Sequence, residues 1–352
     1  MENQTTRKNN SSDFSTGKIK HFFSLFKGPG FYRTDNRVYH PFSVIVQKEI
    51  ADYVRSWRFI ILLVIISLTC LGSMYTALAN IKDAIKPGDP KGSFVFLKLF
   101  TVTDGTLPSF VVFLGFLGPL LGISLGFDAV NSEQNRGTLS RILSQPIHRD
   151  YILNAKFFAS LTVISVMFFA LGFLVMGFGL ASIGIPPTPG EFLRIVVFII
   201  ISIIYVAFWL NLSILFSVRF RQPATAALSG IAIWLFFAVF YSMIIDLISK
   251  GIAPAGLVSE NQIINFENLR LNLLRFSPSQ LFSDATTTLL MPNVRSLGPL
   301  SMAQVYGTIP GPLSLGQSLM LIWPQLTGLI AGTIICFVIS YVSFMRKEIR
   351  SR

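Results

Sequence analysis

Six long apolar runs limit what this chain can fold into more than any other feature of its sequence. A helix needs about 20 apolar residues to cross about 30 Å of hydrocarbon, because each residue rises about 1.5 Å. Apolar residues make up 52% of the chain and charged residues 13%, so a soluble fold would leave too much apolar surface in water. We therefore expect an all-α integral membrane protein with six transmembrane helices, at Phe59–Ala79, Ser109–Phe127, Phe157–Ile183, Phe192–Val218, Ala224–Ile248 and Leu319–Met345.

The positions of Lys and Arg predict the direction in which these helices cross. If the N-terminus is cytosolic, 20 of the 29 basic residues fall in cytosolic segments. We expect both termini in the cytosol, a location in the plasma membrane, and contact between the basic segments and anionic membrane lipid. Nucleic acid is not an expected partner, because no soluble surface interleaves basic and aromatic residues.

The same topology predicts the domain organisation. Residues 1–39 read as a disordered cytosolic tail, residues 40–57 as an amphipathic helix at the membrane surface, and residues 58–348 as the transmembrane domain. External loops are expected at about 80–108 and 249–318, the second with a short amphipathic helix at Asn265–Arg275 on the outer leaflet. Residues 129–156 are expected to be cytosolic.

Glu49 falls inside the apolar arc of the expected surface helix. Two interpretations stay open. The carboxylate either reaches out to the lipid headgroups, or it forms a salt bridge with a cytosolic base such as Arg149 or with a partner subunit.

Small residues line one face of the second expected span, where Gly118, Gly122 and Gly126 recur every four residues. Such stripes let helix backbones approach closely in membranes. The stripe therefore indicates close packing within one chain or, alternatively, a subunit interface. Cys70 and Cys336 lie in apolar runs and are expected to pack as small apolar side chains.

The inventory of polar residues argues against several functions. Away from the ends of the expected spans there is no Asp, Glu, Lys, Arg or His, which disfavours ion-driven transport. The three histidines are scattered, so neither a zinc site nor a Ser/His pair is indicated. No Gly-x-x-x-x-Gly-Lys-Ser/Thr loop is present, so another polypeptide would have to bind any ATP, and no cofactor is expected in this chain.

The segment between the second and third expected spans carries a short helix. Gly137 is expected to break the chain away from the membrane helix, and Thr138 to cap a new one. That helix must stop before Pro146. We expect Leu139, Ile142 and Leu143 to form an exposed apolar stripe that docks into a groove on another protein. The alternative is that these residues pack against the ends of the chain's own spans.

Here the sequence resembles a known family, the ABC-2 type permeases, which are membrane subunits of ATP-binding cassette transporters. The resemblance rests on the patterns Glu133-x-x-x-Gly137-Thr138-Leu139, Leu143-Ser144-x-Pro146-Ile147-x-Arg149 and Lys156-Phe157, together with Lys48-Glu49-Ile50 and Phe344-Met345-Arg346-Lys347-Glu348-Ile349-Arg350. Ser277-Pro278-Ser279 with Ala285-Thr286 is similar to the branch with a long last external loop. One departure is Ala155-Lys156, where the family often has Gly-Lys.

The resemblance implies a half-transporter without catalytic residues of its own. It would pair with a second permease subunit, identical or related, and with ABC ATP-binding subunits that carry ATP and Mg²⁺. Its coupling surface would comprise Glu49, Glu133, Gly137, Thr138, Leu139, Ile142, Leu143, Pro146 and Arg149. Export is expected rather than import, and the substrate is not indicated. The competing interpretations are a secondary carrier or flippase acting alone, and a membrane scaffold that transports nothing.

Overall fold

The computed structural model describes residues 40–80, 94–103, 107–145, 147–184, 186–252, 259–294, 296–299 and 311–347. The regular structure in this part of the chain is entirely helical. Six of its helices are long and apolar enough to cross a membrane. The expected N-terminal tail, residues 1–39, lies outside the described residues.

The six spans lie where the apolar runs predict them. They are α3 (Trp57–Ala79), α6 (Phe110–Gly126) continuing into α7 (Asn131–Asn135), α9 (Arg149–Ile183), α10 (Pro189–Arg219), α11 (Pro223–Leu235) continuing through the π-helix η1 (Phe236–Phe240) into α12 (Tyr241–Ile252), and α16 (Leu315–Arg346).

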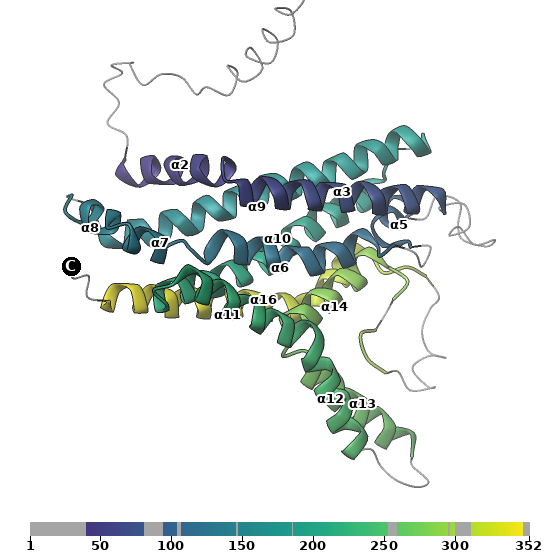
Figure 1. Cartoon of the computed structure of the whole chain (residues 1–352). Helices are drawn as coiled ribbons and strands as arrows, with labels where there is room; N and C mark the ends of the chain where they lie inside the picture. Colours follow the sequence, from purple (N-terminus) through teal and green to yellow (C-terminus); the bar gives the residue numbers. More distant parts are fainter. Residues whose placement is uncertain are drawn as a thin grey trace, which may run out of the picture. The chain divides into compact units, whose positions relative to one another are not determined.

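One expected boundary is wrong, because α9 begins at Arg149 and not at Phe157. The first two turns of α9 contain charged residues, so the apolar run starts later than the helix. Those turns pack beside α2 (Pro41–Val54), the helix that precedes the first span. Figure 1 shows α2, α7 and α8 (Thr138–Leu143) gathered at one end of the helices, called here the α8 end, with α5 (Val95–Thr101) towards the other.

α10 is the most buried of the six spans. It packs chiefly against α6 and α16. A Cβ atom on Gly122 would lie 2.7 Å from the Val206 carbonyl oxygen, and one on Gly126 would lie 2.8 Å from that of Leu210. A Cβ on Gly118 would meet a Val206 methyl group at 2.9 Å. The glycine stripe of α6 therefore lies against α10 of the same chain, where no larger side chain fits.

Both segments expected to be external loops contain helices that the apolar runs did not predict. α5 places Phe96, Leu97, Leu99 and Phe100 in the buried core. α14 (Pro278–Leu290) packs against α16 and α10, and its Thr286 and Thr288 are also buried. Short amphipathic helices lack the continuous apolar run that identifies a span, so hydropathy alone passes over them.

The expected helix at Asn265–Arg275 is part of α13 (Glu260–Leu274). α13 packs against α12, where Arg270 donates to the Asp246 carboxylate at 2.6 Å and the Tyr241 hydroxyl donates to the Leu273 carbonyl at 2.6 Å.

Two buried charges at the start of α10 hold α5 and α14 in place. The Glu191 carboxylate accepts from the Phe96 backbone N–H at 2.9 Å, at the first turn of α5. One turn later, Arg194 is 1% exposed and donates to the carbonyls of Leu289 and Leu313 and to the Ser318 hydroxyl. Buried charges are stable only when hydrogen-bonded in this way. The first turns of α10 thus hold α5 and α14 against the other helices.

Candidate functional site

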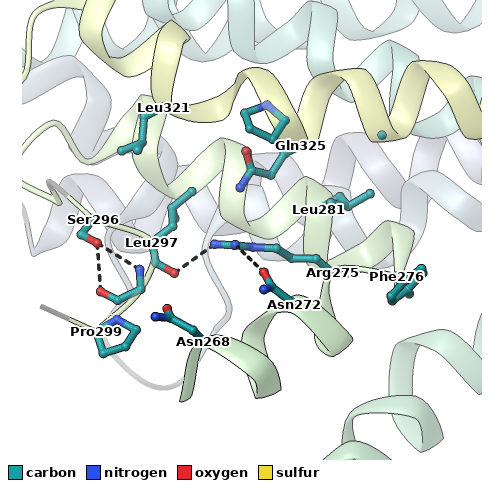
Figure 2. A pocket seen from close by; sticks show the side chains of 13 residues that line it. Asn268, Asn272, Arg275, Phe276, Leu281, Ser296, Leu297, Pro299, Leu321 and Gln325 are labelled. Carbon is teal, nitrogen blue, oxygen red and sulfur yellow. Dashed lines mark hydrogen bonds between the residues drawn. The ribbon is translucent and has the colours of Figure 1, made fainter. Parts of the chain in front are cut away.

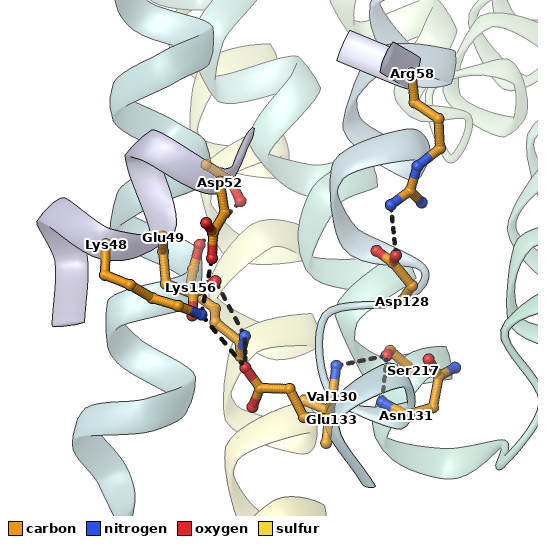
Figure 3. Close-up of polar contacts among 11 residues, drawn as sticks. Lys48, Glu49, Asp52, Arg58, Asp128, Val130, Asn131, Glu133, Lys156 and Ser217 are labelled. Carbon is orange, nitrogen blue, oxygen red and sulfur yellow. Dashed lines mark hydrogen bonds and ion pairs between the residues drawn. The ribbon is translucent and has the colours of Figure 1, made fainter. Parts of the chain in front are cut away.

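A buried ionic cluster lies at the α8 end, where three helices meet. Lys156 of α9 is 4% exposed by its side chain, and its Nζ donates to Glu49 Oε2 of α2 at 3.1 Å and to Glu133 Oε1 of α7 at 2.8 Å. Figure 3 shows the lysine between the two carboxylates. The Lys156 ammonium thereby joins α2, which precedes the first span, to α7, which follows α6.

Glu49 therefore does not extend to the headgroups, since the residue is 5% exposed. A salt bridge is the interpretation that the structure supports, but its base is Lys156 with Lys48, and Arg149 is not involved. Hydropathy does not predict this pairing, because Lys156 lies on the two turns of α9 that precede the apolar run of the third span.

Lys48 and Asp52 form the outer edge of the cluster. Lys48 Nζ lies 2.9 Å from both Glu49 and Asp52 and 3.9 Å from Glu133. Burial acts to lower the pKa of Lys48, but its hydrogen bonds to Asp52 and Glu49 outweigh this, and the pKa is raised. Both lysines are thus held as cations among three carboxylates.

The turn between α7 and α8 depends on Gly137. This residue adopts a left-handed conformation with φ of 69°, which costs a glycine little. Gly137 occupies the cap position, so the expectation that Thr138 caps α8 is wrong. The Thr138 hydroxyl instead donates back to the Glu133 carbonyl at 3.2 Å, and this bond closes the turn.

Hydrogen bonds also tie α7 to α10. The Ser217 hydroxyl of α10 accepts from the backbone N–H groups of Val130 and Asn131, at 2.9 and 3.2 Å. The Asn135 amide donates to the Arg221 carbonyl at 2.9 Å, just beyond α10.

The end of α16 is bonded to the same region. Lys347 Nζ donates to Gln134 Oε1 at 3.0 Å and to the Val218 carbonyl at 2.6 Å. Burial, with the positive charges of Arg221 and Arg219, lowers the pKa of Lys347. The sequence pattern alone shows this lysine only as part of a C-terminal basic motif.

Arg149 stabilises the last turn of α16. Its guanidinium donates to the carbonyls of Phe344 and Lys347 and lies over the Phe344 ring, 5.2 Å from the centroid. Carbonyls at a helix C-terminus lack partners within the helix, so this contact satisfies them.

The expectation that the apolar stripe of α8 is exposed is wrong, and the alternative, packing against the chain's own helices, is what the structure shows. Leu139 is 2% exposed and belongs to the apolar core, while Ile142 is half-buried and packs against that core. The Leu143 side chain and Pro146 lie outside the described part of the structure. The apolar side chains of a short helix are stable when they are buried against another apolar surface. Here the chain's own helices provide that surface. Among the described residues from 135 to 145, the exposed ones are Asn135, Arg136, Gly137, Arg141, Ser144 and Gln145.

Nothing in the described residues forms a group of three His, Cys, Asp or Glu that could hold a metal ion. The cysteines Cys70 and Cys336 are free. The chemistry of the α8 end therefore consists of hydrogen bonds and ion pairs between helices.

Comparison with known proteins identifies the family of this chain. A family model described as "ABC-2 family transporter protein" matches residues 43–349. The chain is 25% identical over 150 residues to "Probable ABC transporter permease protein NosY" of Pseudomonas aeruginosa, which is 41% of this chain and 52% of that protein. It is also 25% identical over 152 residues to the protein of the same name from Stutzerimonas stutzeri, 42% of this chain and 53% of the other. These matches span about half the length of the two relatives. Because the family model covers all six spans and the ionic cluster, the chain belongs to the ABC-2 family of transporter proteins.

Proposed function

We propose that this chain is the permease subunit of an ABC transporter and forms the membrane pathway for its cargo. In this proposal it has no catalytic site or cofactor of its own. A separate ATP-binding subunit binds and hydrolyses ATP with Mg²⁺. A second permease subunit, identical or related, completes the pathway, and the direction is export.

One observation carries the proposal, namely that the α7–α8 segment is bonded to four other helices. Glu133 reaches α2 and α9 through Lys156, Val130 and Asn131 reach α10, and Gln134 reaches the end of α16. Coupling between distant sites travels through such connected polar contacts and rigid helices. A displacement of α8 by a partner would therefore move several spans together.

In this proposal the α8 end faces the cytosol and the membrane is the plasma membrane. Support comes from the excess of Lys and Arg in the segments at that end. The termini would then both be cytosolic, α2 would lie along the inner surface, and α13 would lie outside.

The residues of the coupling surface divide into two roles. Glu49, Glu133, Leu139, Ile142 and Arg149 hold the segment to the chain's own helices. Gly137, Thr138 and Leu143 shape its turn and its end, and Pro146 lies outside the described residues.

The exposed charged side chains on α8 and beside its ends are basic. Arg136 precedes α8 and Arg141 lies on it, while Arg219 ends α10 and Arg221 lies between α10 and α11; all four are exposed. Among the described residues none of the four pairs with a carboxylate. We infer an acidic docking surface on the ATP-binding subunit, because complementary charge steers and orients association.

Copurification with a co-expressed ATP-binding subunit tests the proposal. We expect the unaltered chain to capture that subunit and to stimulate its ATP hydrolysis. Replacing Arg136 and Arg141 by Glu should abolish capture while the chain still inserts, and a matched charge reversal at the opposite end, Lys250→Glu, should leave capture unchanged.

Two results would overturn the proposal. Tight ATP binding by the purified chain alone would contradict a separate nucleotide-binding subunit. Transport by the chain without any ATP-binding partner would favour a lone carrier or flippase, whereas stable complexes without transport or stimulated hydrolysis would favour a scaffold.

A further inference from the structure

A cavity of about 830 Å³ lies between α13, α14, α16 and the short segment 296–299. Its size falls within the range of about 300 to 1,000 Å³ typical of small-molecule sites. Figure 2 shows Gln325 on α16 pointing towards Arg275, which follows the last turn of α13. The cavity shares no residue with the ionic cluster at the α8 end.

The lining changes from polar to apolar along the length of the cavity. Asn268 lies at the outer end, where its Oδ1 would be 3.3 Å from a Cβ on Gly298. At the other end Leu281 meets α16 at Gly328, where a Cβ would lie 3.2 Å from the leucine methyl group. Figure 2 shows Ser296 and Asn268 on one side and Leu281 on the other, with Leu321 of α16 on the side of Ser296. A ligand that fills the whole cavity must be polar at one end and apolar at the other.

The polar end carries no net charge. Arg275 is the single charged residue among the described lining residues, and its Nε donates to the Asp284 carboxylate at 3.2 Å. The guanidinium also donates to Asn272 Oδ1 and to the Leu297 carbonyl. A cation neutralised in this way has little attraction left for an anionic group.

The amides of Asn268, Asn272 and Gln325, with the Ser296 hydroxyl, are the remaining polar side chains of the lining. The Asn268 amide makes no hydrogen bond within the described residues, and Asn272 uses only its oxygen, for Arg275. A side-chain amide both donates and accepts, so it suits hydroxyl and amide groups equally. The rim is therefore matched to an uncharged, hydrogen-bonding group.

The α16 wall of the cavity reaches the surface of the bundle, since its lining residues Pro324 and Gly328 are exposed. α16 crosses the membrane, so an apolar chain could enter the cavity sideways from the lipid. Pro324 breaks the regular hydrogen bonding of α16 beside the cavity, and Gly328 leaves its inner end without a side chain.

We infer that this cavity binds an amphiphile with an uncharged head group rich in hydroxyl or amide groups. The head lies against Asn268 and Asn272, and the apolar chain lies along Leu281 and Gly328. The inference does not depend on ATP coupling, because it concerns binding to this chain alone.

The test uses the full chain in nanodiscs and an alkyl glucoside with a photoreactive group at the end of its chain. We expect saturable labelling that excess octyl glucoside competes away, with the crosslinks mapped to α14 and to α16 around Gly328. Probes with the same chain but a sulfate or a trimethylammonium head should label this site at least about tenfold less well, which corresponds to about 1.4 kcal/mol.

Two variants separate the ends of the cavity. Gly328→Leu fills the apolar end and should abolish site labelling, whereas Gly316→Leu, on α16 with open space around it, should label like the unaltered chain. Asn268→Leu changes an exposed residue and should weaken only glucoside binding, with Asn261→Leu on the same helix as its control. Unchanged labelling in both cavity variants, or equal labelling by the charged probes, would overturn the inference.

Discussion

Lys156→Met is the sharpest test of the ionic cluster. The substitution keeps an apolar stem of similar length but removes the charge between Glu49 and Glu133, whose side chains are 7% and 15% exposed. Both carboxylates then remain in a poorly solvated site with a weaker counter-charge. The affected link is the one that joins α2, α7 and α9.

The expected loss follows from this geometry. Removing one partner of a buried ion pair typically costs about 3 to 5 kcal/mol, because the other charge stays buried. Lys48 still lies 2.9 Å from Glu49, so we expect the lower end, about 3 kcal/mol. Lys48→Met is the matched control. Its side chain is 55% exposed, and surface pairs contribute about 1 kcal/mol or less.

The free energy of unfolding can be measured by titrating a denaturing detergent into mixed micelles. The order expected is a large loss for Lys156→Met, a small loss for Lys48→Met, and partial recovery when Glu49→Gln is added to Lys156→Met. Equal losses for the two lysine variants, or no recovery in the double variant, would refute the reasoning that burial makes this cluster strong.

Three further predictions follow from the packing and the proposed orientation. Gly122→Leu should destabilise the chain by about 1 to 3 kcal/mol or more, because its side chain would meet the α10 backbone, whereas Gly177→Leu, with open space around it, should be neutral in the same detergent titration. Leu139→Asp should lower stability before any partner is added, since it buries a charge in the core, while Arg141→Asp on the exposed side of α8 should not; equal thermal midpoints would contradict the inward packing of α8. In a cysteine-free background, a cysteine at Asn268 should react with an impermeant reagent in intact cells and one at Arg141 only after lysis, and the reverse pattern would invert the proposed topology.

Hydropathy and residue spacing determined much of the architecture without any tertiary information. The six spans are local properties of the sequence, since about 20 apolar residues in a row have one stable arrangement in a bilayer. The spacing of Gly118, Gly122 and Gly126 likewise indicated a close helix contact, because residues four apart share one helical face. It did not indicate whether the opposing helix was α10 of the same chain or another subunit.

The tertiary structure decided which residues meet. Lys156 pairs with a glutamate 107 residues away and with another 23 residues away, and no local pattern specifies such a partner. Leu139 is a second example. An apolar stripe predicts that its residues are buried, but not whether they pack against the same chain or against another protein. α14 was missed because its helix is short and amphipathic, and only the helices around it make it part of the core. Periodicity along one segment thus predicts that a segment is helical and which face is apolar, whereas contacts between distant segments depend on how the whole chain packs.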